Sequence, residues 1–170
     1  KSEENDLISE MFLRLNEGVN LTAPEKRNAI GGKLVKLIRK FGEHHFFKNQ
    51  VKISNLRYQH YEMAVRLLFI EHCLNQDKLL DTKKIYLDQL ARDYKDKSIS
   101  SEISDMVQNI LDTMTRVFYE HDALLSKQSR IPLYYLIFRE AKKQNKLRNI
   151  TYEEIQKFYE KLKKNKELAN

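Results

Sequence analysis

Glycine and proline are scarce in this chain, and their scarcity bears first on the fold class. The 170 residues include four Gly and two Pro. A sheet-rich domain needs a turn about every 8–12 residues, usually built from Gly, Pro, Asn or Asp, whereas Gly and Pro are unfavourable inside helices. With 41% hydrophobic residues, the composition predicts a helical chain with a core, enough for one domain or slightly more.

Long apolar runs and paired cysteines are missing as well. The longest apolar run, Ile131–Phe138, is far shorter than the roughly 18 residues that a membrane span needs, and the first residues show no signal-peptide pattern. The single Cys73 has no partner for an internal disulfide. These absences predict a reduced, cytoplasmic setting and no membrane partner. Because the sequence begins at Lys1 without Met, we expect it to be part of something longer.

Excess positive charge is confined to the last quarter of the chain, whose net charge is +7. Residues 127–170 hold 12 Lys and Arg against 5 Glu, while residues 1–126 hold 19 basic and 19 acidic residues. Such asymmetry indicates a nucleic-acid or acidic partner, or a solvated helical face. The residues predicted to contact nucleic acid, DNA in the first place, are Lys142, Lys143, Lys146 and Arg148.

Apolar side chains recur at spacings of three and four along most of the chain, which predicts an all-α bundle of six or seven helices without a significant sheet. The predicted helices cover residues 4–15, 22–40, 57–75, 82–95, 99–125, 131–144 and 151 onward. Capping boxes are predicted for Thr22 with Glu25 and for Thr151 with Glu154. The pair Gly31-Gly32 suggests a kink or the close approach of another backbone.

The helix predicted over residues 57–75 is apolar almost all round, which is typical of a helix at the centre of a bundle. Arg66 lies inside its apolar run, and Glu62 precedes it by four residues. A buried Arg needs a carboxylate partner, and this spacing provides one on the same helix face. We therefore expect Arg66 to be buried and paired with Glu62.

No pattern of catalytic or metal-binding residues rises above chance. The five histidines do not stand at zinc-ligand spacing with Cys or carboxylates, and no phosphate-binding Gly loop, Gly-x-Ser-x-Gly or His-Glu-x-x-His motif occurs. Arg followed four to six residues later by His, as in all-helical nucleases of the HEPN type, occurs at Arg39/His44, Arg66/His72 and Arg116/His121. Chance alone predicts roughly one such pair, and a motif this short carries a high risk of false positives. We predict no catalytic residue and no metal site in this chain.

One stretch of the sequence matches a family motif that is more specific than the short patterns above. Residues 12–29 read Phe-Leu-Arg-Leu-Asn-Glu-Gly-Val-Asn-Leu-Thr-Ala-Pro-Glu-Lys-Arg-Asn-Ala. They match ten fixed positions, in order, of Phe-x-Arg-Leu-Asn-x-Gly-x-x-Leu-x-x-x-Glu-x-Arg-Asn-Ala. This stretch resembles the signature of the GmrSD-type restriction family, whose N-terminal end is similar to the ParB/sulfiredoxin fold. The resemblance implies a nucleotide-hydrolysing domain that acts in bacterial defence against foreign, often modified, DNA.

Two other motifs of that family do not occur in the chain: the Asp-Gly-Gln-Gln-Arg motif of its nucleotide site and the His-Asn-His nuclease motif. The resemblance therefore implies that residues 1–56 are the end of the GmrSD-like domain and that residues 57–170 are a helical bundle with a basic C-terminal end. The role implied is that of a scaffold and a DNA or partner contact, with the upstream catalytic half as partner. It implies no cofactor in this chain, and NTP with Mg²⁺ for the full-length, NTP-dependent restriction endonuclease.

The resemblance also assigns the residues near the nucleotide, which are Arg14, Asn16, Glu25, Arg27 and Asn28. Arg and amide side chains around a helix N-terminus form an anion-facing surface. The same residues also suit a helix–turn–helix lock, in which Glu25 caps, an Arg pairs with a carboxylate and Asn16 bonds the loop backbone. The alternative function is a helical protein- or nucleic-acid-interaction module unrelated to nucleotide hydrolysis.

Overall fold

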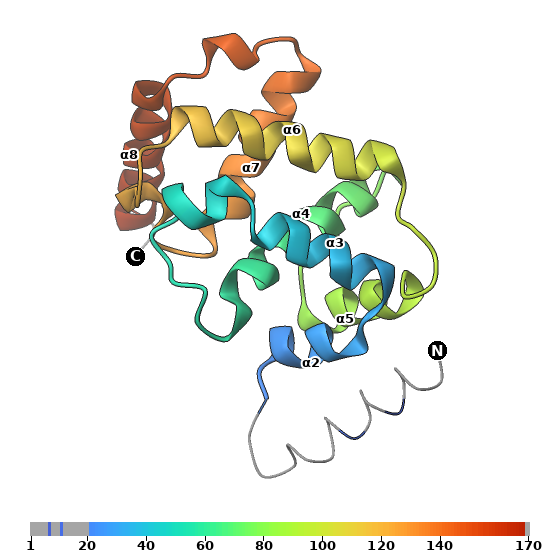
Figure 1. Cartoon of the computed structure of the whole chain (residues 1–170). Coiled ribbons are helices and arrows are strands. Elements are labelled where there is room, and N and C mark those ends of the chain that lie inside the picture. The colour runs from blue at the N-terminus through green and yellow to red at the C-terminus, as the bar shows by residue number, and fades with distance from the viewer. Residues whose placement is uncertain (1–6, 8–10, 12–20, 169–170) are drawn as a thin grey trace. The chain divides into compact units, whose positions relative to one another are not determined.

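A computed structural model gives the fold and describes residues 7, 11 and 21–168 (Figure 1). The described structure is 73% helical, which confirms the all-α prediction, and the number of helices described is slightly above the predicted six or seven. Within the described residues there is no strand, and the only ladder pairing there is one isolated parallel bridge between Val51 and Asp122. Of the helix predicted over residues 4–15, Leu7 and Met11 are described, and both are helical.

The chain divides into two compact units. Unit 1 comprises residues 1–43 and 54–107, and unit 2 comprises residues 44–53 and 108–170. The division at residues 56 and 57 rests on the resemblance and stays a prediction. The segment after residue 43 belongs to unit 2, where the Phe46 ring packs against Phe118 with ring centroids 6.2 Å apart.

Unit 1 is built around α4. Its elements are α2 (Ala23–Ile30), α3 (Gly32–Gly42), the 3-10 turn η2 (Leu56–Tyr58), α4 (Gln59–Leu74), α5 (Lys84–Asp93) and the first part of α6 (Ser101–Val117). Helix α4 is buried on nearly every side, as its all-round apolar sequence predicted, and it packs along α3 and contacts α2 and α5. It starts later than predicted because Arg57 and Tyr58 have left-handed backbone angles, with φ of 54° and 63°.

The helix predicted over residues 22–40 is broken at the glycine pair. Gly31 and Gly32 have φ of 69° and 85°, and they separate α2 from α3. A Cβ on Gly32 would collide with the backbone of Lys95, and the amide of Lys33 donates to the Lys95 carbonyl at 2.7 Å. The prediction of a close backbone approach at this pair is therefore confirmed.

Unit 2 has an aromatic core. Its elements are the π-helix η1 (Phe46–Gln50), the second part of α6, the 3-10 turns η3 (Ala123–Leu125) and η4 (Leu147–Asn149), α7 (Arg130–Lys143) and α8 (Tyr152–Leu168). Phe118 contacts Tyr134 and Phe138 of α7, with ring centroids 5.4 and 6.0 Å apart. Tyr135, which follows Tyr134 in the sequence, is also fully buried. Helix α6 ends at Val117, whereas the sequence predicted that it would continue to residue 125. The chain turns after Val117, and the buried Asp122 caps η3.

Among residues 21–168, no helix combines the length and the apolarity that crossing a bilayer requires.

Candidate functional site

The residues assigned by the resemblance lie at the start of α2, so far as the structure describes them. Arg14 and Asn16 lie outside the described residues. Glu25, Arg27 and Asn28 occupy the first two turns of α2. Each of these three side chains makes contacts inside unit 1.

Glu25 closes the capping box that the sequence predicted. Its Oε2 accepts hydrogen bonds from the backbone N–H and the hydroxyl of Thr22, at 2.6 and 2.8 Å. Arg57 holds the carboxylate in a fork, with Nε 3.0 Å from Oε1 and Nη2 2.9 Å from Oε2. These donors favour the charged form, and the Arg57 hydrogen bonds followed by those from Thr22 lower the pKa of Glu25 from 4.5 to about 2. Glu25 therefore ties η2 to the N-terminus of α2.

Arg27 is buried in unit 1, with only 2% of its surface exposed. Its Nη1 donates to Glu62 Oε2 at 2.6 Å, its Nε donates to Asp88 Oδ1 at 3.0 Å, and its Nη2 lies 2.8 Å from the same Asp88 oxygen. The guanidinium thus bridges carboxylates from α4 and α5. A buried charge needs this kind of pairing, so Arg27 joins three helices of unit 1.

Arg66 shares Glu62 with Arg27 but is not buried. Its Nε and Nη2 lie 3.2 and 3.0 Å from Glu62 Oε1, which confirms the predicted pair, and its Nη1 lies 3.2 Å from the Thr82 hydroxyl. The prediction of burial was wrong, because 30% of the Arg66 side chain is exposed. The Arg66 side chain contacts Thr82, in the loop before α5, rather than the core.

Asn28 pairs with the next helix. Arg39 of α3 donates through Nε to Asn28 Oδ1 at 2.7 Å and through Nη2 to the Asn28 carbonyl at 3.4 Å. A cavity of about 10 Å³ lies beside Arg27 and Asn28. That volume is about enough for one water molecule. The cap formed by Glu25 and the pairing of Arg27 with carboxylates are two of the contacts expected for the helix–turn–helix lock. The third contact, by Asn16, lies outside the described residues. The proximity of Glu25, Arg27 and Asn28 to a nucleotide stays a prediction.

The predicted nucleic-acid contacts lie together at one end of α7. Lys142 and Lys143 end this helix, Lys146 follows it, and Arg148 lies in η4. Lys143, Lys146 and Arg148 are exposed and Lys142 is half-buried. Lys146 Nζ donates to Gln144 Oε1 at 3.1 Å, and within residues 21–168 none of the four forms an ion pair. This cluster is called the α7 basic cluster below.

A shallow groove of about 500 Å³ adjoins the α7 basic cluster. Its apolar lining consists of half-buried side chains of α7 and of Ile150, namely Leu133, Leu136, Ile137, Ala141 and Ile150. Glu140, Lys146 and Glu154 lie among its polar lining. The groove is large enough for apolar side chains of another molecule, and sequence periodicity did not predict it because η4 folds Ile150 back beside α7.

In two of the Arg–His pairs, the arginine contacts side chains other than its histidine. Arg66 contacts Glu62 and Thr82, whereas His72 lies against Gln76 and the Tyr94 ring, and burial lowers the pKa of His72. Arg116 donates to its own helix at Thr113, 3.3 Å away. Within the described part, no group of three or more His, Cys, Asp or Glu side chains is arranged to hold a metal ion.

Sequence reasoning missed the environment of His44 in unit 2. His44 Nδ1 accepts a hydrogen bond from the Phe46 backbone N–H at 3.1 Å, so the proton of the neutral ring is on Nε2. Nε2 lies 3.0 Å from Asp112 Oδ1 and 2.9 Å from Gln108 Nε2. The partners come from α6, more than 60 positions away, and no local spacing could have indicated them. The arrangement fixes the start of η1 on α6.

Comparison of the chain with protein-family models, with curated proteins and with solved structures finds no match.

Proposed function

We propose that this chain is the helical part of a GmrSD-like, nucleotide-dependent DNA-restriction protein and that its unit 2 contacts DNA. The family assignment is supported by the ten signature positions in residues 12–29. The role of unit 1 is that of a scaffold, since Glu25, Arg27 and Asn28 connect α2 to α3, α4, α5 and η2. In this proposal the isolated chain hydrolyses no nucleotide and cuts no nucleic acid.

The observation that carries the DNA contact is the distribution of charge between the units. Unit 2 contains 15 Lys and Arg against 8 Asp and Glu, whereas unit 1 contains 16 of each. The whole net charge of +7 therefore belongs to unit 2. Exposed Lys and Arg without carboxylate partners bind phosphates without sequence preference, and the α7 basic cluster has this character.

A duplex-binding titration at two salt concentrations tests the contact. The affinity should fall with salt, with a log–log slope of about −0.9 per phosphate neutralised. Changing Lys142, Lys143 and Lys146 together to Ala should flatten the slope by about one unit per lost contact. The matched control changes three exposed lysines of the electroneutral unit 1, Lys26, Lys33 and Lys36, and should leave the slope unchanged.

Absence of duplex binding at low salt would refute the DNA contact, and equal effects of both triple variants would show that the α7 basic cluster is not the site. The family assignment has its own test in the parent gene. Upstream coding sequence for Asp-Gly-Gln-Gln-Arg supports it, and a start codon at Lys1 counts against it.

The groove in unit 2 favours a second candidate function, a protein-interaction module unrelated to nucleotide hydrolysis. Five half-buried aliphatic side chains line this groove, and phosphates gain nothing from such a surface, whereas an apolar face of a partner protein does. Leu136→Asp would abolish capture of a partner protein at this groove and leave DNA binding intact, so the two functions are separable.

A further inference from the structure

Unit 2 exposes a large aromatic ring at the turn after α6. Tyr119 is 63% exposed. Its ring meets the ring of Tyr152, the first residue of α8, edge to face, with centroids 4.5 Å apart and an interplanar angle of 65°. The Tyr119 ring is therefore supported from within unit 2 and also open to solvent.

The turn that carries Tyr119 is held firmly. The buried carboxylate of Asp122 accepts hydrogen bonds from the backbone N–H of Tyr119 at 3.2 Å and of Leu124 at 2.8 Å, and from the Tyr152 hydroxyl at 3.3 Å. Asp122 thus holds the backbone at Tyr119 and the hydroxyl of Tyr152. The Tyr119 ring itself is positioned by its edge contact with the Tyr152 ring.

Main-chain contacts fix the same turn to the end of η1. The amides of His121 and Asp122 donate to the carbonyls of Asn49 and Gln50, both at 2.8 Å. His121 has a left-handed φ of 46°, and its side chain is exposed. A left-handed backbone is uncommon for a residue with a Cβ, and here the two hydrogen bonds to η1 hold it.

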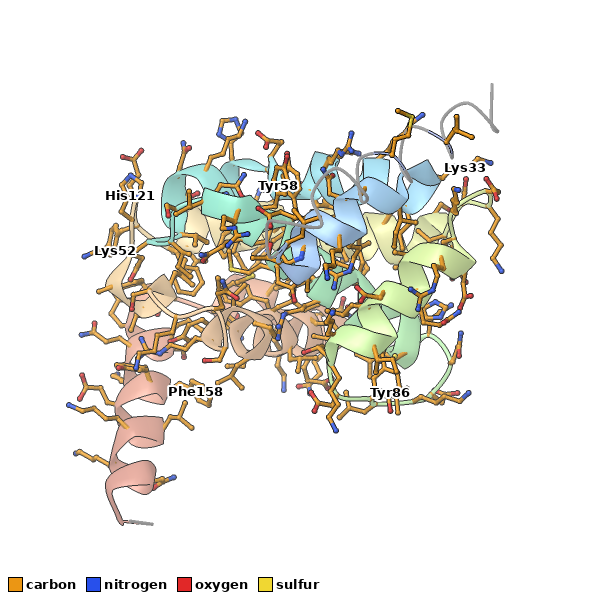
Figure 2. The ribbon with its side chains drawn as sticks, turned by 90° about the horizontal axis from the view of Figure 1, so that it is seen from below. Lys33, Lys52, Tyr58, Tyr86, His121 and Phe158 are labelled. Atoms are coloured by element: carbon orange, nitrogen blue, oxygen red, sulfur yellow. The ribbon has the colours of Figure 1, made fainter. Side chains whose placement is uncertain are left out.

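One exposed cation, Lys52, lies next to the bridge that joins this turn to the end of η1. Lys52 is exposed and directly follows Val51, which forms the bridge to Asp122, and Figure 2 shows Lys52 and His121 at the same end of unit 2. Glu120, between Tyr119 and His121, is exposed and carries the opposite charge. Phosphates would therefore lie on the side of Lys52, within a unit whose net charge is +7.

We propose that Tyr119, supported by Tyr152, is a stacking platform for an unpaired base of single-stranded nucleic acid. The inference rests on the proposed nucleic-acid contact and adds the strand state that unit 2 prefers. Every base has a π-face that stacks on an aromatic ring, so this recognition tolerates any sequence. Paired bases are already stacked on their neighbours in a duplex, and a surface ring does not reach their faces.

The test measures binding of the full chain to a labelled single strand of mixed sequence and to the duplex made from it. Tyr119→Ala should weaken single-strand binding by roughly 5- to 150-fold, the equivalent of about 1–3 kcal/mol for one stacked base, and should leave duplex binding within about twofold. Tyr119→Phe keeps the ring and should keep the affinity. The control Tyr86→Ala removes another exposed tyrosine, on unit 1 (Figure 2), and should have no effect.

The outcomes separate the two proposals. Binding of neither strand form by the wild-type chain would refute both. Duplex binding with a Tyr119→Ala variant that holds the single strand as tightly as wild type would refute the platform alone. A Tyr119→Ala loss that is equal for both strand forms, or a loss in Tyr119→Phe as large as in Tyr119→Ala, would also overturn it.

Discussion

Arg27 and Glu62 form the buried ion pair of unit 1, with Nη1 of the guanidinium 2.6 Å from Oε2 of the carboxylate. The second oxygen of Glu62 accepts from Arg66, and Asp88 supplies the second carboxylate to Arg27. Two arginines and two carboxylates balance one another in charge, and every one of them has a partner. Arg27 is the costly member to remove, because its loss takes from Asp88 the cation that pairs with it.

Arg27→Ala should therefore destabilise the chain far more than Arg66→Ala. We expect a loss of about 3–5 kcal/mol in the free energy of unfolding for Arg27→Ala, as for one partner of a buried pair. Arg66 is 30% exposed on its side chain, and its removal leaves Glu62 paired with Arg27. Its loss should therefore be about 1 kcal/mol or less. Urea unfolding of the wild type, Arg27→Ala and Arg66→Ala measures both losses in stability. Equal losses would contradict the assignment of Arg27 as the buried member.

The sequence predicted those parts of the fold that depend on neighbours in the chain. Helical spacing and all-round apolarity located α4 and its central position in unit 1. Both capping boxes formed, the second through Thr151 and Glu154, whose reciprocal bonds are 3.4 Å long. A cap needs only residues within one turn of each other, so its chemistry is readable from spacing alone.

The parts that were missed depend on residues far apart in the sequence. Arg66 was chosen as the buried arginine because it lies in an apolar run, whereas Arg27, in a polar run, is buried by carboxylates 35 and 61 positions away. Nothing local marks that partnership. The end of α6 at Val117 was missed for a similar reason, since the turn that follows it is fixed by the buried Asp122 and by the carbonyls of η1.

Gly42, the last residue of α3, should tolerate no side chain as long as Tyr61 keeps its ring. A Cβ at Gly42 would collide with the Tyr61 ring, which is stacked on Tyr58 and whose hydroxyl donates to Glu43 Oε1 at 3.0 Å. Gly42→Ala should cost about 1–3 kcal/mol as an overpacked site. In a Tyr61→Ala background the same change should become neutral or stabilising by up to about 1 kcal/mol, since Ala favours a helix over Gly.

A double-mutant cycle by chemical denaturation measures this coupling. If Gly42→Ala costs the same with and without the Tyr61 ring, the ring is not what requires glycine at this position.

The stability contributed by Glu25 should depend on pH in the acid range. Its pKa is lowered from 4.5 to about 2, first by Arg57 and then by Thr22. A carboxylate with a lowered pKa in the folded state binds its proton less readily there than in the unfolded chain, so its contribution is complete above pH 4.5 and disappears as the pH falls to about 2. The difference in Tm between wild type and Glu25→Gln should accordingly be largest near neutral pH and shrink through that window.

Arg57→Gln provides the control, because it removes the largest cause of the shift and leaves the Thr22 hydrogen bonds in place. An NMR titration of the Glu25 carboxyl carbon should give a pKa of about 2 in the wild-type chain and a value closer to 4.5 in Arg57→Gln. The pH dependence of the Tm difference should weaken in parallel when Glu25→Gln is made in that background. An unchanged Glu25 pKa in Arg57→Gln would mean that the capping box alone holds the carboxylate ionised, and that the fork between Arg57 and Glu25 does not tie η2 to α2.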